Sequence, residues 1–171
     1  MFSVNKNKIF YVLGAVLIII IGVFSVWFLN SPEPVQNIPV VGQQNYNTAQ
    51  NIQTVQSVQI GKATIKVELA TTTAEQIQGL SGRTSLAANT GMLFIFDHPA
   101  FWGIWMKDMN FPIDVLWITD DLKINYIVED MTPASYPQDY VSKTPARYVL
   151  ELPVGTVKND GIAVGQSVIF K

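Results

Sequence analysis

The stretch that predicts the fold most directly is VQIGKATIKVELA, residues 58–70. Its apolar positions 65, 67 and 69 alternate with Lys66 and Glu68. Because successive side chains of a strand point to opposite faces of a sheet, this alternation is typical of a half-buried β-strand. Residues 58–60 can form a second strand that pairs with it.

Short apolar runs of strand length follow at 92–96, 101–106, 115–119, 123–129, 148–152 and 167–170. A short helix is expected before them, because Thr72 or Thr73 is followed three residues later by Glu75 or Gln76, the spacing of a capping box. A single helical turn is expected within 155–161. Short strands with two minor helices predict an α+β, mostly β domain, built as a compact antiparallel barrel or sandwich.

A different pattern occupies the N-terminus. Residues 9–29 are IFYVLGAVLIIIIGVFSVWFL, without a charge or a proline. As a helix they would be about 31 Å long, close to the thickness of the hydrocarbon core of a membrane. We therefore expect one transmembrane helix at 9–29. No small-x-small cleavage motif follows it, which favours an uncleaved anchor over a signal peptide.

The residues around this segment predict its orientation. Lys6 and Lys8 precede it, and the next basic residue is Lys62. Because basic residues favour the cytoplasmic side, residues 1–8 should be cytoplasmic, and a single-pass protein of the cell membrane would carry its globular domain, 58–171, outside. Residues 30–57 contain eleven Asn and Gln and three prolines. With few large apolar side chains to bury, they are expected to form a disordered tether.

The composition excludes several classes of function. The chain has no cysteine, which excludes thiol redox chemistry, cysteine nucleophiles and zinc–thiolate sites. Residues 58–171 carry nine Lys and Arg against twelve Asp and Glu, with no basic run. Since nucleic-acid binding needs clustered cations to neutralise phosphates, no nucleic-acid partner is expected. No motif indicates a cofactor or a metal, and none is expected.

Five motifs are too specific to be filler: GLSGRTSL (79–86), GMLFIF (91–96), WMKD (105–108), FPID (111–114) and ARYVLELPVG (146–155). Together they resemble the domain of unknown function 192 family, also called uncharacterised protein family 0127, over about residues 60–170. The resemblance implies a small β-rich domain, often behind a signal peptide or one N-terminal span, without a settled activity. The chain departs from the family pattern at Asp108 and Met109, where Asn and Thr are usual, so the role of position 108 stays open.

Four charged residues lie within or beside apolar stretches of these motifs: Arg83, Lys107, Asp114 and Glu151. Buried charges need partners, because an unpaired one costs several kcal/mol. One interpretation is structural, with Arg83 or Lys107 paired to Asp114 or Glu151 so that loops are fixed. The other is functional, with some of the four converging on a cleft that binds a polar or charged ligand.

Aromatic residues are concentrated in one segment and comprise Phe101, Trp102, Trp105, Phe111 and Trp117. Such rings form the core of a small domain or, if exposed, a surface on which sugars or peptide side chains stack. Trp102 and Trp105 are the candidates for stacking. Because Trp105 lies in a run that is apolar on both faces, the sequence predicts that it is buried.

Three functions follow from these features. The first is a membrane-anchored extracytoplasmic module that binds or assists an envelope component, whether a glycan, a peptide or a protein. The second is a metal-independent hydrolase of glycans or peptides that uses Asp114 and Glu151 as paired carboxyl groups. The third is a copper-handling module, for which His98 and Met92, Met106, Met109 and Met131 would supply soft ligands, although methionine more often packs in a core.

Overall fold

The computed structural model describes residues 54–171. The predicted transmembrane helix at 9–29, residues 1–8 and nearly all of the predicted tether lie outside the described residues. Within residues 54–171, no helix is both long and apolar enough to cross a membrane. Val55 and Val58 are already buried in the core, so packing begins slightly before residue 58.

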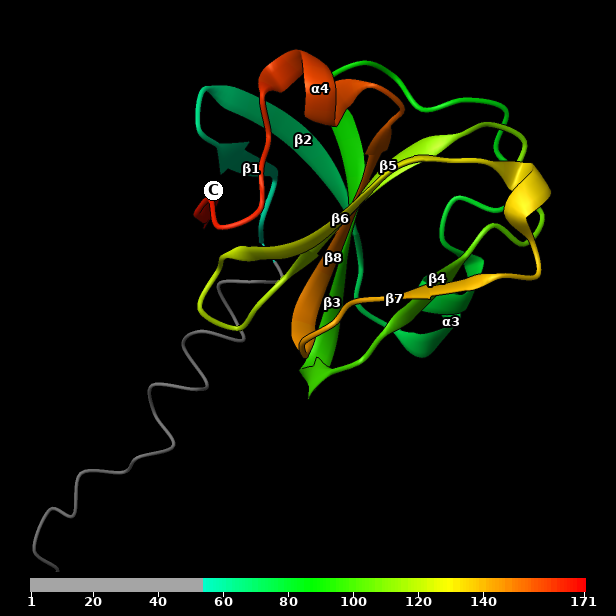
Figure 1. Cartoon of the computed structure of the whole chain (residues 1–171), viewed down its shortest axis with the longest axis horizontal. Coiled ribbons are helices and arrows are strands. Elements are labelled where there is room, and N and C mark those ends of the chain that lie inside the picture. The colour runs from blue at the N-terminus through cyan, green and yellow to red at the C-terminus, as the bar shows by residue number, and fades with distance from the viewer. Residues whose placement is uncertain (1–53) are drawn as a thin grey trace, which may run out of the picture. The chain divides into compact units, whose positions relative to one another are not determined.

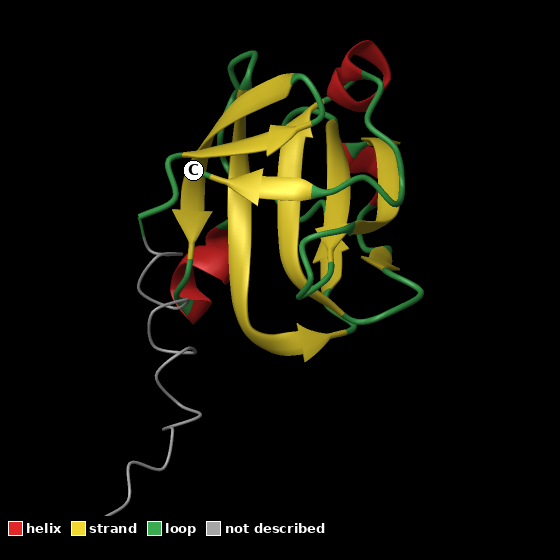
Figure 2. Cartoon of the chain, turned by 90° about the vertical axis from the view of Figure 1, so that its left-hand side faces the viewer, coloured by secondary structure: helices red, strands yellow, loops and turns green. Residues whose placement is uncertain are grey.

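Seven strands form one curled sheet in the order β6-β5-β8-β3-β2-β1-β9 (Figure 1). The view of Figure 2 shows the sheet bending round as half of a barrel. The strands are β1 (Ser57–Ile60), β2 (Ala63–Ala70), β3 (Thr90–Ala100), β5 (Ile113–Ile118), β6 (Ile124–Met131), β8 (Ala146–Pro153) and β9 (Val168–Phe170). The prediction of a mostly β domain with two short helices is confirmed.

Among the paired strands of the described domain, all but one pair are antiparallel, as predicted. β1 and β2 form the expected hairpin, in which Val58 lies opposite Ile65. β2 and β3, however, are parallel, with Glu68 beside Met92. Parallel neighbours need a crossover connection, and residues 71–89 provide it. The antiparallel prediction is wrong for this pair, because nothing within either strand marks its direction.

The two faces of the sheet carry separate apolar clusters. The α4-side cluster includes Val157 of α4 (Thr156–Asp160), packed with residues such as Leu116 of β5. The α3-side cluster includes Leu80, just after α3 (Thr73–Gln78), and Trp117 of β5. Leu116 and Trp117 are neighbours in the chain, and they divide between the clusters because a strand alternates its side chains.

A two-stranded sheet of β4 (Gly103–Trp105) and β7 (Asp139–Val141) packs on the α3-side cluster. Ile104 of β4 is buried there, whereas Trp105 is 50% exposed. The predicted burial of Trp105 is therefore wrong, and the strand expected at 101–106 is reduced to three residues. The physical reason is that alternate residues of a covering strand face solvent.

Both helices lie where the sequence predicts them. At the start of α3, Glu75 N donates to Thr72 Oγ1 at 3.3 Å, and Thr72 N donates to Glu75 Oε2 at 2.9 Å. These reciprocal bonds confirm the capping box. The α4 helix occupies the turn expected within 155–161. The long connection before β8 contains a short 3-10 helix, Pro133–Ser135, besides β7.

The C-terminal segment brings the two edges of the sheet together. β9 pairs with β1, and the residues around its start reach β6 at the other edge. Ile124 N donates to Gln166 O at 3.0 Å, and Val168 N donates to Leu122 O at 2.8 Å. Because unpaired strand edges invite association with other chains, these bonds protect the start of β6.

Candidate functional site

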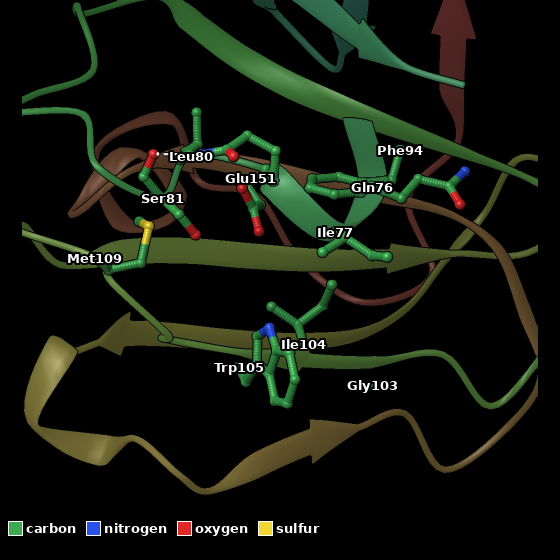
Figure 3. Close-up of a pocket in the computed structure, with 12 residues that line it drawn as sticks. Gln76, Ile77, Leu80, Ser81, Phe94, Gly103, Ile104, Trp105, Met109 and Glu151 are labelled. Atoms are coloured by element: carbon green, nitrogen blue, oxygen red, sulfur yellow. Dashed lines mark hydrogen bonds between the residues drawn. The ribbon is translucent and has the colours of Figure 1, made fainter. Parts of the chain in front are cut away.

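A pocket lies between the end of α3 and strand β4, on the α3 side of the sheet (Figure 3). Its inner part has a volume of about 50 Å³, and a wider depression of about 480 Å³ adjoins it. Ile77 and Trp105 line both parts. Both side chains are exposed, Ile77 by 69% and Trp105 by 50%, so together they form an apolar rim.

The walls of the inner pocket are mixed: the apolar side chains include Leu80, Phe94, Ile104 and Met109, and the uncharged polar ones are Gln76, Gln78 and Ser81. Glu151 is the one ionisable side chain among the residues that line it. In Figure 3 the carboxyl group of Glu151 lies among these labelled side chains. The inner pocket therefore combines apolar and uncharged polar side chains with a single acid.

The strand register places Glu151 on this face of the sheet. In β8 it pairs with Met92 of β3 on one side and with Val115 of β5 on the other. Met92 in turn lies beside Glu68 of β2. A Cβ atom at Gly91 would lie 2.7 Å from the Glu151 carbonyl oxygen, so glycine allows β3 and β8 to approach closely here.

The carboxyl group of Glu151 is buried and incompletely paired. The residue is only 5% exposed, and its Oε2 atom has no hydrogen-bond partner in the described structure. Burial disfavours the charged form and raises the pKa of Glu151 to about 8, although the positive charge of Arg83 opposes this rise. The carboxyl group is therefore mostly protonated at pH 7. A buried acid with a raised pKa in a cleft is a candidate functional group.

Arg83 lies near enough to influence Glu151 but is bound to a different acid. Its terminal nitrogens donate to the two Glu68 oxygens at 2.8 and 2.7 Å. These bonds hold the pKa of Glu68 below its usual range. The predicted ion pair of Arg83 with Asp114 or Glu151 is therefore wrong.

Lys107 is also paired elsewhere, because its Nζ donates to Asp108 at 2.6 Å. The predicted pairing of Lys107 with Asp114 or Glu151 is wrong as well. Asp108 has a φ of 55°, in the left-handed region that Asn and Asp tolerate better than most residues. This backbone conformation explains why position 108 accepts Asp, as here, as well as the Asn that is usual in the family pattern. The conformation belongs to a turn beside the pocket.

Hydrogen bonds tie this turn to the loop after α3. Gly82 N donates to Asp108 O, and Ser81 Oγ donates to Lys107 O, each at 2.8 Å. Ser81 and Lys107 both line the wider depression. The mouth of the pocket is therefore held by contacts within the protein.

Asp114 lies on the opposite face of the sheet from Glu151. Its cross-strand partner is Leu152, whereas Glu151 pairs with Val115, the neighbour of Asp114. Because neighbours in a strand point to opposite faces, the two carboxyl groups cannot flank one substrate bond. The hydrolase hypothesis, which needs Asp114 and Glu151 as a pair, is therefore wrong.

Asp114 has a structural role instead. It is completely buried. Its Oδ1 accepts a bond from Asp130 N at 3.0 Å, and its Oδ2 accepts one from Val157 N at 2.9 Å. Val157 belongs to the first turn of α4, whose amides lack partners within the helix. Asp114 thus fixes α4 to the sheet.

The two candidate tryptophans have different environments. Trp102 stacks on Phe96, with ring centroids 4.1 Å apart and an angle of 10° between the planes. Its carbonyl oxygen accepts a bond from the Trp117 indole at 2.9 Å. Trp102 is thus a packing residue. Trp105, by contrast, meets the edge of the Tyr136 ring at 6.2 Å and remains half exposed at the pocket.

The residues proposed for a copper site are not arranged as ligands. Met92, Met106 and Met131 are buried in the α3-side cluster. His98 is exposed, and its ring contacts that of Trp102 at 5.4 Å. Residues 54–171 contain no group of three or more His, Cys, Asp or Glu side chains that could hold a metal ion.

Several residues of the pocket were not identified from the sequence. Ile77, Ser81 and Phe94 meet there from α3, the following loop and β3. Glu68 was seen only as a polar position of an alternating strand. Ile77 is an apolar residue on a mainly polar helix, but single exposed apolar residues are common, so the sequence offers no specific indication of its place at the pocket.

Comparisons with known proteins agree with this fold. The family model described as DUF192, uncharacterized ACR, COG1430, matches residues 55–170. A Sinorhizobium meliloti 1021 protein described as a proposed transcription regulator is 35% identical, with a TM-score of 0.63 over 67% of this chain and 92% of its own. A protein of unknown function from Novosphingobium aromaticivorans DSM 12444 is 28% identical, with a TM-score of 0.63 over 67% of this chain and 84% of its own. No curated protein matches the sequence.

Proposed function

The chain belongs to the DUF192 family (COG1430), and we propose that it is a binding module. Its pocket at Glu151 would take up a small polar or charged group of an envelope component. A residue that only supports the fold has its polar atoms paired, as Asp114 has. Glu151 is equally buried, yet Oε2 has no partner among the described residues. Since an unpaired buried polar atom costs about 1–3 kcal/mol, a ligand that pairs with it would recover that energy.

Binding is favoured over catalysis by what surrounds this acid. The inner part of the pocket supplies no second ionisable group. Lys107 and Asp108, which line the wider depression, are paired with each other, and the Ser81 hydroxyl already donates to Lys107 O. General acid–base catalysis commonly needs a second group that supplies or removes a proton or acts as the nucleophile. A lone acid among apolar and uncharged polar side chains can orient and select a ligand without a second ionisable group.

Extracytoplasmic anchoring is a separate part of the proposal. It rests on the uncharged apolar run at 9–29 and on Lys6 and Lys8 before it. Protease added to intact cells stripped of any outer layer should then release a fragment that begins between residues 30 and 57. Protection of the whole domain until lysis would contradict the proposed orientation.

The regulatory role proposed for the Sinorhizobium relative is not carried over to this chain. DNA binding depends on clustered cations that are free to meet phosphates. In the described domain Arg83, Lys107, Lys123 and Arg147 each lie in an ion pair with a carboxylate. The balance of nine basic against twelve acidic residues in 58–171 also favours a partner other than a nucleic acid.

The binding proposal can be tested with ligand-observed NMR on the purified full chain. The panel would contain blocked amino acids, N-acetylated and plain monosaccharides, and short alcohols and amines. At least one class should bind, and Trp105→Ala at the rim should weaken that binding. Phe101→Ala is the matched control, because Phe101 is 60% exposed but does not line the pocket. Equal effects of both variants would contradict the assignment of the pocket.

A further inference from the structure

We infer that the group bound in this pocket is a primary ammonium on an alkyl chain, as in a lysine side chain, with the Glu151 carboxylate as its counter-ion. The inference rests on the proposed binding function and names the ligand of that same site. It depends on three features: the charges around the pocket, the shape and lining of its two parts, and the electrostatic environment of the acid.

The charges around the pocket select against an anion. Arg83 is held by Glu68 in a bidentate pair, and Lys107 is held by Asp108. An anionic ligand would have to break one of these pairs to gain a partner. Among the ionisable residues of the described lining, Glu151 is the one whose carboxyl group has an oxygen without a partner. A cation or hydrogen-bond donor therefore matches the pocket best.

The shape of the two parts matches an alkylammonium group. The inner part, about 50 Å³, has room for a head group, since on the same kind of measure a single water needs roughly 10–15 Å³. The adjoining depression, lined by Ile77 and Trp105, can hold an aliphatic stem along apolar surface. The Trp105 ring also offers a π face to a cation, and Trp is the best aromatic partner for one.

A peptide-borne lysine fits this arrangement better than a small free amine. The depression is several times larger than the inner pocket, so there is space for atoms beyond the stem. Gln78 and Ser81 also line the depression. Gln78 Nε2 donates to Ser81 O and Ser81 Oγ donates to Lys107 O, so their side-chain oxygens can accept hydrogen bonds from the N–H groups of a peptide backbone. A free butylammonium ion would leave this region empty.

The surroundings of Glu151 predict how binding depends on pH. Its neighbours on β3 and β5 are the apolar Met92 and Val115. The charges that face it come from Arg83, which is paired with Glu68, and at the mouth from Lys107 and Asp108. With a pKa of about 8, the acid must lose its proton when an ammonium binds at neutral pH. The proton goes to the solvent, and the ammonium replaces it beside the carboxylate.

The test uses the full chain and two matched probes, Nα-acetyl-lysine-N-methylamide and Nα-acetyl-norleucine-N-methylamide. The second has a methyl group in place of the ammonium. Binding is followed by the 13C-methyl resonance of Met109, which lines the inner pocket. We expect the apparent Kd of the lysine probe to fall about tenfold between pH 6 and pH 7, and only about twofold between pH 8 and pH 9. The norleucine probe should bind more weakly, with a higher Kd that does not depend on pH.

The variant Glu151→Gln keeps the size of the side chain but removes its charge. It should abolish both the pH dependence and the preference for lysine over norleucine. Calorimetry of the wild-type chain provides a second measurement that needs no variant. In buffers with different heats of ionisation, the lysine probe should release close to one proton per molecule bound at pH 7.

The outcomes separate this inference from the broader proposal. If the norleucine probe or another neutral ligand binds as tightly as lysine at pH 8, the ammonium inference is overturned but the pocket is still a binding site. If nothing in the panel binds, both are overturned. If n-butylamine binds as tightly as the lysine probe, the ammonium stands and the peptide-borne source is overturned.

Discussion

Asp114 and Glu151 occupy almost the same position in the sheet and differ in nearly everything else. One lies opposite Leu152 and the other opposite Val115, so they face the α4 side and the α3 side respectively. Asp114 has a backbone amide on each oxygen, whereas Glu151 has an oxygen without a partner in the described structure. The comparison teaches that burial alone does not identify a functional acid. What separates these two buried acids is the number of their hydrogen-bond partners.

The largest expected effect belongs to the acid with partners. Asp114→Asn would turn an amide NH2 toward one of the two N–H donors, the buried one of Val157 or the partly buried one of Asp130, leaving that donor unpaired. We expect the free energy of unfolding to fall by about 3 kcal/mol, measured by urea unfolding of the full chain. The control is Asp120→Asn, which removes only an exposed pair with Arg147 and should cost less than about 1 kcal/mol. An unchanged midpoint for Asp114→Asn would mean that this side of the comparison is not structural.

The next effect comes from the unpartnered acid and should have the opposite sign. The pKa of Glu151 is about 8 in the folded chain, whereas the ordinary value for a glutamate is 4.5. Its protonated form therefore favours folding below pH 4.5, and this contribution is lost between pH 4.5 and 8 at roughly 1.4 kcal/mol per pH unit. The loss reaches roughly 5 kcal/mol by pH 8. Glu151→Gln should remove this slope, but the buried amide itself costs about 1–3 kcal/mol without partners, so we expect the variant to be about 2 kcal/mol more stable than wild type at pH 8.

Thermal melts of both chains from pH 5 to pH 8 measure this difference. If Glu151→Gln destabilised the chain at every pH, the carboxyl group would have a partner that supports the fold, and the contrast with Asp114 would disappear.

A smaller effect is expected at the rim of the pocket. Because Trp105 is 50% exposed, Trp105→Ala should lower the free energy of unfolding by only about 1 kcal/mol, less than the 3–5 kcal/mol typical of a buried ring. Chemical denaturation checks this value, with Phe101→Ala as a reference for another exposed ring. A loss of several kcal/mol would mean that the ring belongs to the core and is not available to a ligand.

The smallest effect on stability is expected at Arg83. Its pair with Glu68 is partly exposed, with side-chain exposures of 35% and 59%, and such pairs contribute about 0–1 kcal/mol. The positive charge nevertheless lowers the pKa of Glu151, so Arg83→Gln should raise that pKa further. A 13C titration of the Glu151 carboxyl would record the change. A pKa that stayed the same would separate Arg83 from the electrostatics of the pocket.

Local features of the fold could be predicted from the sequence. The alternation at 65–69 and the spacing of Thr72 and Glu75 depend on residues close together in the chain, and both predictions are confirmed. The parallel pairing of β2 with β3 could not be predicted, because it depends on how residues 71–89 cross the sheet. The exposure of Trp105 was missed for a related reason, since the covering sheet of β4 and β7 joins distant segments.

The candidate site was predicted in part. Glu151 was identified because a charged residue within the apolar run YVLEL is costly to bury unless it has a partner or a function. Its predicted partner was wrong, since the cation nearest to it, Arg83, is bound by Glu68 in a different strand. Asp114 was identified by the same reasoning, although its partners are backbone amides. Nearly every residue carries the same backbone N–H group, so no pattern of residue types could have shown which ones bind Asp114.

The pairing of β1 with β9 has a consequence for the order in which the domain folds. Val58 lies beside Phe170, so the first and last strands of the domain are neighbours. This contact closes a loop of nearly the whole domain, which carries a high entropic cost and slows folding. During synthesis one edge of β1 therefore stays unpaired until β9 has left the ribosome. A chain cut short before β9 would keep that edge open permanently.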